Sequence, residues 1–460
     1  MTTFKKVSRL LILLIFLANS IFGQQAYQLA QLVNAAIKFY PVIKQKEALY
    51  NASIASTKEI QHSFLPQVKL SDQLNYGTDN SIAGSFFPLG ITPSTSGGVR
   101  SVNNNQPVLG TAGVIYGEYE FYNFGLNKSK VNTAKSISSL QLSDLQKDQY
   151  ILSLQVAKLY MSLMQVQFKL EADQQNVNRY DSIFKVIRAI TLSGLKPGAD
   201  TSLAKAELSK AQISLNNTKG NLLQLKEQLF LLTGIPSNQI EIESGKFLSI
   251  NIPEISNNQI DNNVNPLLDY YDKKKRVFKD NEQVIKKTYL PKFYLEGSYW
   301  ARGSSIQYND TYKNLNTGFD FQRTNYLLGV AVTYNLFNTV YKNDKLKINK
   351  YQLAASDFEY QQQENQIHSA IVQANNAIVT SKLNMQELPT QVKSANDTYM
   401  QKMAQYRAGV INLIDLTNAA FVLYRSQIDW LETVNQYYNA LLDQATAKGN
   451  LSEFIKNFKY

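Results

Sequence analysis

The fold is decided by residues 65–76, whose sequence is Leu-Pro-Gln-Val-Lys-Leu-Ser-Asp-Gln-Leu-Asn-Tyr. From Val68 onward, apolar residues alternate with polar ones, which predicts a strand with one apolar face and one wet face. A second alternating stretch opens with Leu290-Pro291-Lys292-Phe293, and in both places Leu-Pro closes a helical pattern. The recurrence of this junction predicts two copies of one structural unit.

A second landmark supports the duplication. The pattern G-x5-D-x3-A starts at Gly194 and recurs at Gly409, in the same order relative to the Leu-Pro junctions. One such coincidence could arise by chance, whereas two in the same order favour a tandem duplication.

Each half is expected to contain one β-hairpin, at residues 65–122 and 291–337. The first hairpin encloses a loop at about 77–110 that is rich in Gly, Ser, Asn and Pro. The second alternates from Tyr326 to Leu336. The chain therefore carries four strands of about ten to twelve residues each, which is long enough to cross a bilayer when tilted.

A very long helix is expected after each hairpin. Apolar residues recur at spacings of four and three from Leu152 to Leu170 and every seven residues from Leu346 to Ala374. Heptads sustained this far predict coiled-coil packing, with an ordinary amphipathic bundle as the alternative. Return helices should run to about Leu232 and Ala447, and Pro389 should bend one long helix.

The helical turns have recognisable end signals. Gly194 and Gly409 suit the left-handed position after a helix, and Asn412 can cap the helix that follows. In the first half, Asp200 or Thr201 is expected to serve as the cap. Helices at about 26–64 and 265–289 should precede the two hairpins.

The N-terminus predicts export. Three cations, the last of them Arg9, precede the apolar run 10–17, and residues 1–23 read as a signal peptide. The alternative, a membrane anchor, needs a run of about 20 apolar residues. The expected organisation is then a first repeat at 24–233, a connecting segment at 234–264, a second repeat at 265–447 and a tail at 448–460.

Composition excludes several kinds of site. The 460 residues include no cysteine and two histidines, so disulfides, thiolate metal sites and thiol nucleophiles are ruled out. The sequence has no phosphate loop, nucleophile elbow or zinc-protease motif. We therefore expect no catalytic residue, no cofactor, no metal and, with a net charge of +11 that forms no basic block, no nucleic acid.

Four amphipathic strands cannot close a barrel alone, and inside lipid an unpaired strand edge is very costly. Two copies would supply eight strands and three would supply twelve, enough for an aqueous lumen. The alternative is a soluble β-sandwich. Aromatic residues near the expected strand ends favour the membrane; they are Tyr76, Tyr116, Phe121, Tyr299, Tyr326 and Phe337.

The repeated order of signal peptide, helix, Leu-Pro-strand, hairpin, long helix and G-x5-D-x3-A return resembles the TolC-type outer-membrane efflux protein family, or outer membrane factors. The resemblance implies a mixed α and transmembrane β fold: a trimeric 12-stranded β-barrel, with four strands per chain, continued by a long coiled-coil helical tunnel. It implies a passive exit channel of a tripartite efflux or secretion system in the outer membrane. The partners implied are the homotrimer, a periplasmic adaptor, an inner-membrane pump and outer-membrane lipid. The alternative function is a secreted coiled-coil scaffold or adhesin with a soluble β-sheet.

The resemblance also places candidate sites. The family's periplasmic constriction uses two acids three residues apart, and these positions match Asp415 and Asn418. Because the second acid is missing, Leu413 or Leu416 becomes a candidate hydrophobic gate, while Asp415 could alternatively serve only the helix start. The adaptor-docking tips match two turns, which consist of Gly194, Leu195 and Lys196 and of Arg407, Ala408, Gly409 and Val410.

Overall fold

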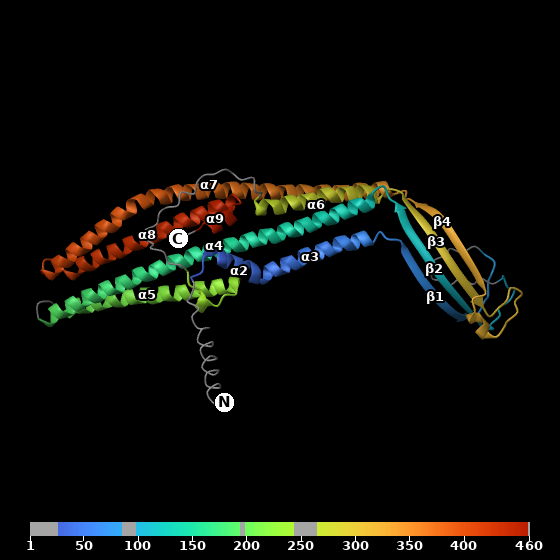
Figure 1. Ribbon diagram of the computed structural model, residues 1–460, viewed down its shortest axis with the longest axis horizontal. Coiled ribbons are helices and arrows are strands. Elements are labelled where there is room, and N and C mark those ends of the chain that lie inside the picture. Colours follow the sequence, from blue (N-terminus) through green and yellow to red (C-terminus); the bar gives the residue numbers. More distant parts are fainter. Residues whose placement is uncertain (1–25, 85–97, 194–197, 243–264, 459–460) are drawn as a thin grey trace, which may run out of the picture. The chain divides into compact units, whose positions relative to one another are not determined.

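The computed structural model describes residues 26–84, 98–193, 198–242 and 265–458, so the signal peptide predicted at 1–23 lies outside the described residues. In chain order the elements are α2 (Leu29–Phe39), α3 (Pro41–His62), β1 (Gln67–Gly77), β2 (Val108–Tyr122), α4 (Leu126–Leu192), α5 (Gly198–Thr233), η1 (Ser237–Gln239), α6 (Pro266–Thr288), β3 (Lys292–Ser304), η3 (Leu315–Phe319), β4 (Arg323–Thr333), α7 (Asn338–Arg407), α8 (Leu413–Ala447) and α9 (Leu451–Asn457) (Figure 1). The order helix, two strands, long helix and return helix occurs twice.

The chain packs as two compact units, each built from both halves of the sequence. The sheet unit comprises residues 52–138 and 274–355, and the helical unit comprises the rest. Helices α4 and α7, of 67 and 70 residues, contribute to both units. Among the described helices, none is both long and apolar enough to span a membrane.

The sheet unit contains one four-stranded antiparallel sheet in the order β1-β2-β3-β4 (Figure 1). Residues that face one another across antiparallel strands share a face, so the register decides which side chains lie together. Val68 faces Gly117, Gly117 faces Gly297, and Gly297 faces Leu328. This row crosses the sheet on one face.

The two faces of the sheet differ sharply in chemistry. One, the apolar face, is exposed and, apart from Asp72, uncharged. Its large residues are Val68, Leu70, Leu74, Tyr76, Ile115, Tyr119, Leu295, Tyr299, Tyr326, Leu328, Val330 and Val332. The opposite, polar face carries Lys69, Ser71, Gln73, Glu118, Glu120, Glu296, Arg302 and Asn325. Tyr116, expected among the membrane aromatics, lies on the polar face, where its hydroxyl donates to Glu118 at 2.9 Å.

Both edges of the sheet are open in the described chain. Every residue of β1 is exposed, as is nearly every residue of β4, and each of these strands pairs on one side only. An exposed apolar sheet with two free edges is unstable in water as a monomer and invites pairing with further strands.

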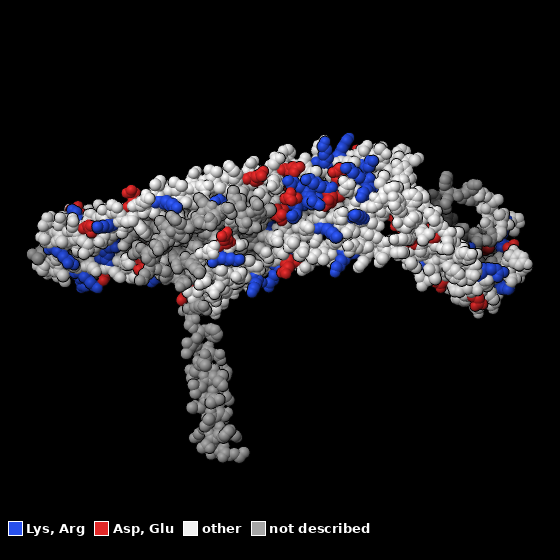
Figure 2. Space-filling model, turned by 45° about the horizontal axis from the view of Figure 1, so that its top comes forward, with Lys and Arg blue, Asp and Glu red and all other residues white. Residues whose placement is uncertain are grey.

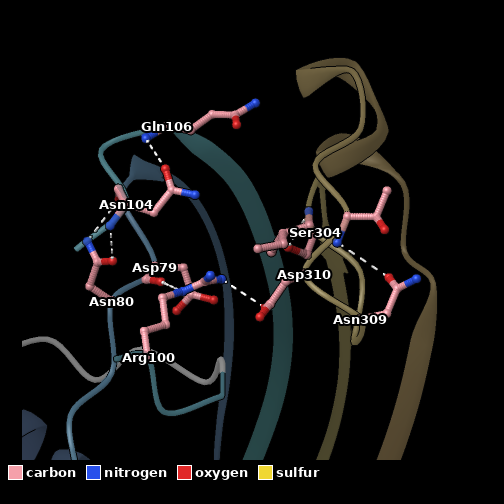
Figure 3. Close-up of polar contacts among 10 residues, drawn as sticks. Asp79, Asn80, Arg100, Asn104, Gln106, Ser304, Asn309 and Asp310 are labelled. Carbon is pink, nitrogen blue, oxygen red and sulfur yellow. Dashed lines mark hydrogen bonds and ion pairs between the residues drawn. The ribbon is translucent and has the colours of Figure 1, made fainter. Parts of the chain in front are cut away.

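The loops at the far end of the sheet are tied together by polar contacts (Figure 3). Arg100 of the β1–β2 loop donates from Nε to the Asp79 carbonyl oxygen at 2.6 Å and forms an ion pair with Asp310 of the β3–β4 loop at 2.9 Å. Asn80 and Asn104 exchange two hydrogen bonds, of 2.8 and 3.0 Å. The loops of the two halves are thus joined through one arginine.

Two element boundaries differ from the sequence prediction. The single helix expected at 26–64 is two helices, because Tyr40 adopts an extended conformation (ψ 122°) immediately before Pro41. Strand β4 ends at Thr333, before the expected Leu336. There Asn335 accepts a hydrogen bond from the backbone N–H of Phe337 at 2.8 Å, an Asx turn that starts the approach to α7.

Pro389 does not break α7, which remains one helix from Asn338 to Arg407. The C-terminal part of α7 curves in Figure 1. The return helices end at Thr233 and Ala447, in agreement with the sequence.

Two apolar clusters hold the helical unit together. The larger joins residues of α2, α4, α5, α8 and α9, and the smaller lies where α4 and α7 end and α5 and α8 begin. The predicted tail contains helix α9, whose Leu451 and Ile455 are buried in the larger cluster. The ring of Phe458 contacts Tyr160 and Tyr438 edge-on.

Candidate functional site

The turn between α7 and α8 has the geometry that its sequence predicts. Gly409 lies in the left-handed region (φ +76°), which glycine adopts without strain. The N–H of Gly409 donates to the Tyr406 carbonyl at 3.0 Å, and that of Val410 donates to the Gln405 carbonyl at 2.9 Å. These two bonds form a Schellman motif, so the chain reverses at this glycine.

Helix α8 begins with the predicted cap. The Asn412 side chain accepts a hydrogen bond from the backbone N–H of Asp415 at 2.9 Å. Asp415 lies in the first turn, where the helix dipole favours a carboxylate. Its side chain is exposed, as is that of Asn418 one turn later. Asp415 can therefore stabilise the start of α8 and still present its carboxylate to a pore.

The structure corrects the expected hydrophobic gate. Leu413 and Leu416 are 1% and 0% exposed and belong to the smaller apolar cluster, together with Ile183 of α4 and Ala204 of α5. Their side chains hold the helices of one chain together and are not available to an opening. The exposed side of the α8 start carries Ile414, Phe421 and Val422 beside Asp415 and Asn418.

The tip of the first half, between α4 and α5, is described up to Ser193 and from Gly198 onward. Gly194, Leu195 and Lys196 lie outside the described residues. Helix α5 begins at Gly198, so Asp200 lies in its first turn and not at the cap position expected for it. The Asp200 carboxylate is 3.5 Å from the hydroxyl of Tyr406 at the end of α7. Burial and then the Asp200 charge raise the pKa of Tyr406.

The sequence reading missed a polar cluster deeper in the helical unit. The side chain of Asp173 in α4 is fully buried and accepts hydrogen bonds from Lys169 at 2.9 Å, Thr218 of α5 at 2.6 Å and Tyr424 of α8. Burial alone would raise the pKa of Asp173, but these donors outweigh it and hold that pKa below its ordinary value. The sequence feature that points to this cluster is the interruption of the apolar spacing of α4 at Asp173.

Asp173 joins the two halves of the sequence. Its carboxylate lies between α4 and α5 of the first half and α8 of the second, and Ser214 of α5 adds a longer bond at 3.3 Å. In the described part of the chain, no group of three His, Cys, Asp or Glu residues is arranged to hold a metal ion. Asp173 therefore fixes α4, α5 and α8 to one another inside the helical unit.

The comparisons with known proteins agree with this geometry. A family model described as outer membrane efflux protein matches residues 32–235 and 275–450. No curated protein sequence matches the chain significantly.

Three solved structures illustrate the fold match. The CmeC outer membrane channel of Campylobacter jejuni is 16% identical, with a TM-score of 0.75 over 93% of this chain and 88% of that chain. VceC of Vibrio cholerae is 13% identical, with a TM-score of 0.72 over 92% and 96%. The MtrE outer membrane channel of Neisseria gonorrhoeae is 14% identical, with a TM-score of 0.69 over 92% and 89%. At these identities the likeness shows the fold.

The family match spans most of the chain and confirms the resemblance read from the sequence, whereas a secreted scaffold or adhesin finds no support. The chain therefore belongs to the outer membrane efflux protein family and is an efflux channel of the outer membrane with a large helical periplasmic part.

Proposed function

We propose that three copies of this chain form one channel, in which each copy supplies four strands of a 12-stranded barrel. The observation that carries the proposal is the sheet with an exposed apolar face and two open edges. In lipid every strand edge must be paired, so β4 of one copy pairs with β1 of the next until the barrel closes. Three copies leave an aqueous lumen lined by the polar face, whereas two give a barrel filled by its own side chains.

The channel works passively in this proposal. A periplasmic adaptor and an inner-membrane pump deliver the substrate and supply the energy, and this chain catalyses no reaction. The polar face of the sheet and the exposed polar residues of the tip support a water-filled path.

The oligomeric state tests the proposal directly. We expect the protein extracted from outer membranes to have the mass of three chains in detergent and to migrate on SDS gels as a trimer that heating dissociates. Single channels should appear in planar bilayers. A monomer extracted without detergent would contradict the proposal.

Asp415 forms the constriction at the tips in this proposal, with Asn418 beside it. Three Asp415 carboxylates around one axis attract cations and repel anions. We expect Asp415→Asn to reduce the preference of the channel for cations severalfold, measured from reversal potentials across bilayers with a salt gradient. The control is Glu227→Gln on the exposed side of α5, which removes the same charge. Equal effects of the two variants would exclude Asp415 from the constriction.

The tips bind the adaptor in this proposal through Arg407, Ala408, Gly409 and Val410, joined by Gly194, Leu195 and Lys196 of the first half. At the second-half tip, Gly409 has open space around it and Val410 is 72% exposed. We expect Gly409→Trp to abolish crosslinking to the adaptor and export, because the ring would prevent close approach of the two backbones.

Two further variants isolate the steric effect. Val410→Trp places the same ring next to Gly409 without the strain of a left-handed conformation, and should act likewise. Gly220→Trp, on an open surface in the middle of α5, should leave crosslinking unchanged. Normal crosslinking by both tip variants would show that the adaptor binds elsewhere.

A further inference from the structure

Lysines gather where the helices meet the sheet. Within nine residues of the sheet-side ends of α3, α4, α6 and α7 there are ten lysines, against only four carboxylates. We call these lysines the basic collar; they are Lys58, Lys128, Lys130, Lys135, Lys279, Lys286, Lys287, Lys342, Lys345 and Lys347. The segments have a net charge of +6, more than half of the +11 of the whole chain.

Part of the collar is free to bind a partner. Lys128, Lys279, Lys345 and Lys347 are exposed, and within the described residues none of their side chains makes a hydrogen bond or ion pair. Lys287, in contrast, is held by Ser129 at 2.9 Å. Figure 2 shows Lys and Arg, with Asp and Glu among them, over α6 and the adjoining part of α7.

Aromatic rings lie at the end of the sheet that is next to the collar. Phe121, Tyr122, Phe124 and Phe293 form a cluster at the end of β2 and the start of β3, with ring centroids 4.8 to 6.3 Å apart. Aromatic side chains favour the boundary between hydrocarbon and headgroups. The lysines begin directly beyond this cluster, at Lys128 in α4 and Lys287 in α6.

For six of the ten collar lysines, which lie within four residues of a sheet-side helix end, the spacing matches the headgroup layer. At about 1.5 Å per residue, the first helical turns lie within the roughly 5–8 Å occupied by headgroups on each side of a bilayer. The other four, Lys135, Lys279, Lys345 and Lys347, lie about 10–14 Å along the helices and act on the headgroups from within roughly one Debye length of that layer. Cations placed beside an interface in this way bind anionic lipid, and each added cation tightens that binding severalfold.

We propose that the basic collar binds the phosphate headgroups of anionic phospholipids in the periplasmic leaflet of the outer membrane. The proposal rests on the placement of the sheet in that membrane. The polyanionic wall polymer of the periplasm is the other occupant that such a charge could attract. Lipid is favoured because the collar adjoins the aromatic cluster and the apolar face without a gap.

The test compares two variants of equal charge. The collar variant changes Lys128, Lys279, Lys345 and Lys347 to Gln, and the matched control changes four exposed lysines of the helical unit to Gln, namely Lys205, Lys210, Lys219 and Lys382. Affinity for phosphatidylglycerol and phosphatidylcholine is measured by the shift of the thermal unfolding midpoint of the full-length protein in neutral detergent. We expect phosphatidylglycerol to bind more tightly, and the collar variant to bind it at least about tenfold more weakly than the control.

Several outcomes would overturn the proposal. The first is that the wild-type protein binds the two lipids with equal affinity. The second is that the collar and control variants lose the same amount of affinity for phosphatidylglycerol. The third is that the collar variant keeps its affinity for phosphatidylglycerol and loses only its cosedimentation with purified peptidoglycan. The outer-membrane content and trimer of each variant are measured first, so a failure of the channel itself is recognised separately. If the fourfold variant does not assemble, the double variant Lys128→Gln and Lys345→Gln should still lower the phosphatidylglycerol affinity, and its failure to do so would refute the role.

Discussion

Leu328→Arg is expected to remove the protein from the outer membrane, whereas Leu327→Arg is expected to leave it there. Both leucines lie in the middle of β4 and are exposed in the single chain, Leu328 by 76% and Leu327 by 64%. They differ in the face they occupy, because Leu328 faces Gly297 on the apolar face and Leu327 faces Ser298 on the polar face. An arginine at the lipid-facing midplane of a barrel costs about 2–4 kcal/mol, and one in the lumen costs little.

The measurement is the amount of heat-dissociable trimer in the outer-membrane fraction after equal expression. Because neither leucine is buried within the chain, loss of packing cannot explain a difference between the variants. In three copies the penalty is threefold, so we expect almost no trimer for Leu328→Arg. Equal yields of the two variants would mean that the apolar face does not meet lipid.

Asp173→Ala is expected to lower the stability of the helical unit by about 3 kcal/mol. Removing one partner of a buried ion pair typically costs about 3–5 kcal/mol, and the lower end applies because the Lys169 side chain is one-third exposed and can turn to water. The hydroxyls of Thr218 and Tyr424 also lose their acceptor. Thermal unfolding followed by circular dichroism measures the effect.

Asp181→Ala is the matched control for Asp173. Asp181 lies on the same helix and pairs with Lys185 at the same i,i+4 spacing, at 2.7 Å, but its side chain is 40% exposed. Its loss should cost at most about 0.5 kcal/mol. If the two substitutions lower the stability equally, burial does not increase the contribution of the Asp173 hydrogen bonds and ion pair to stability.

The lowered pKa of Asp173 also gives a pH dependence. The carboxylate is bonded in the folded chain, so its folded pKa lies below its unfolded value. The stabilisation is complete above the unfolded pKa, near 3.9, and is lost as pH falls through the folded value. We expect the stability gap between the wild-type protein and Asp173→Asn to shrink when unfolding is measured below about pH 4. If the difference in stability does not change with pH, the destabilisation by Asp173→Asn comes from altered packing and hydrogen bonding of the amide and not from the lost charge.

Local signals predicted most of the fold. The alternation after Leu65-Pro66 defined β1, and Gly409 with Asn412 defined the turn at the second tip, because a left-handed glycine and a side-chain cap are decided by neighbouring residues. The break at Tyr40 is also a local signal, since the residue before a proline avoids the helical conformation.

Contacts between distant segments could not be read in this way. Leu413 and Leu416 looked available for a gate, but the core they enter includes residues of α4 and α5, more than two hundred residues earlier. The three donors that surround Asp173 come from three helices, and no single stretch of sequence displays them together. Periodicity shows that a helix has an apolar side, but it does not show which helix covers that side.

The first and last described helices, α2 and α9, close the same apolar cluster. Leu32 and Ile455 therefore reach their final surroundings only when nearly the whole polypeptide is present. Export directed by the predicted signal peptide would deliver α9 last, so the larger cluster would close only after the whole chain has reached the periplasm. We therefore expect a tag that disturbs α9 to leave the larger cluster incomplete and the protein sensitive to periplasmic proteases.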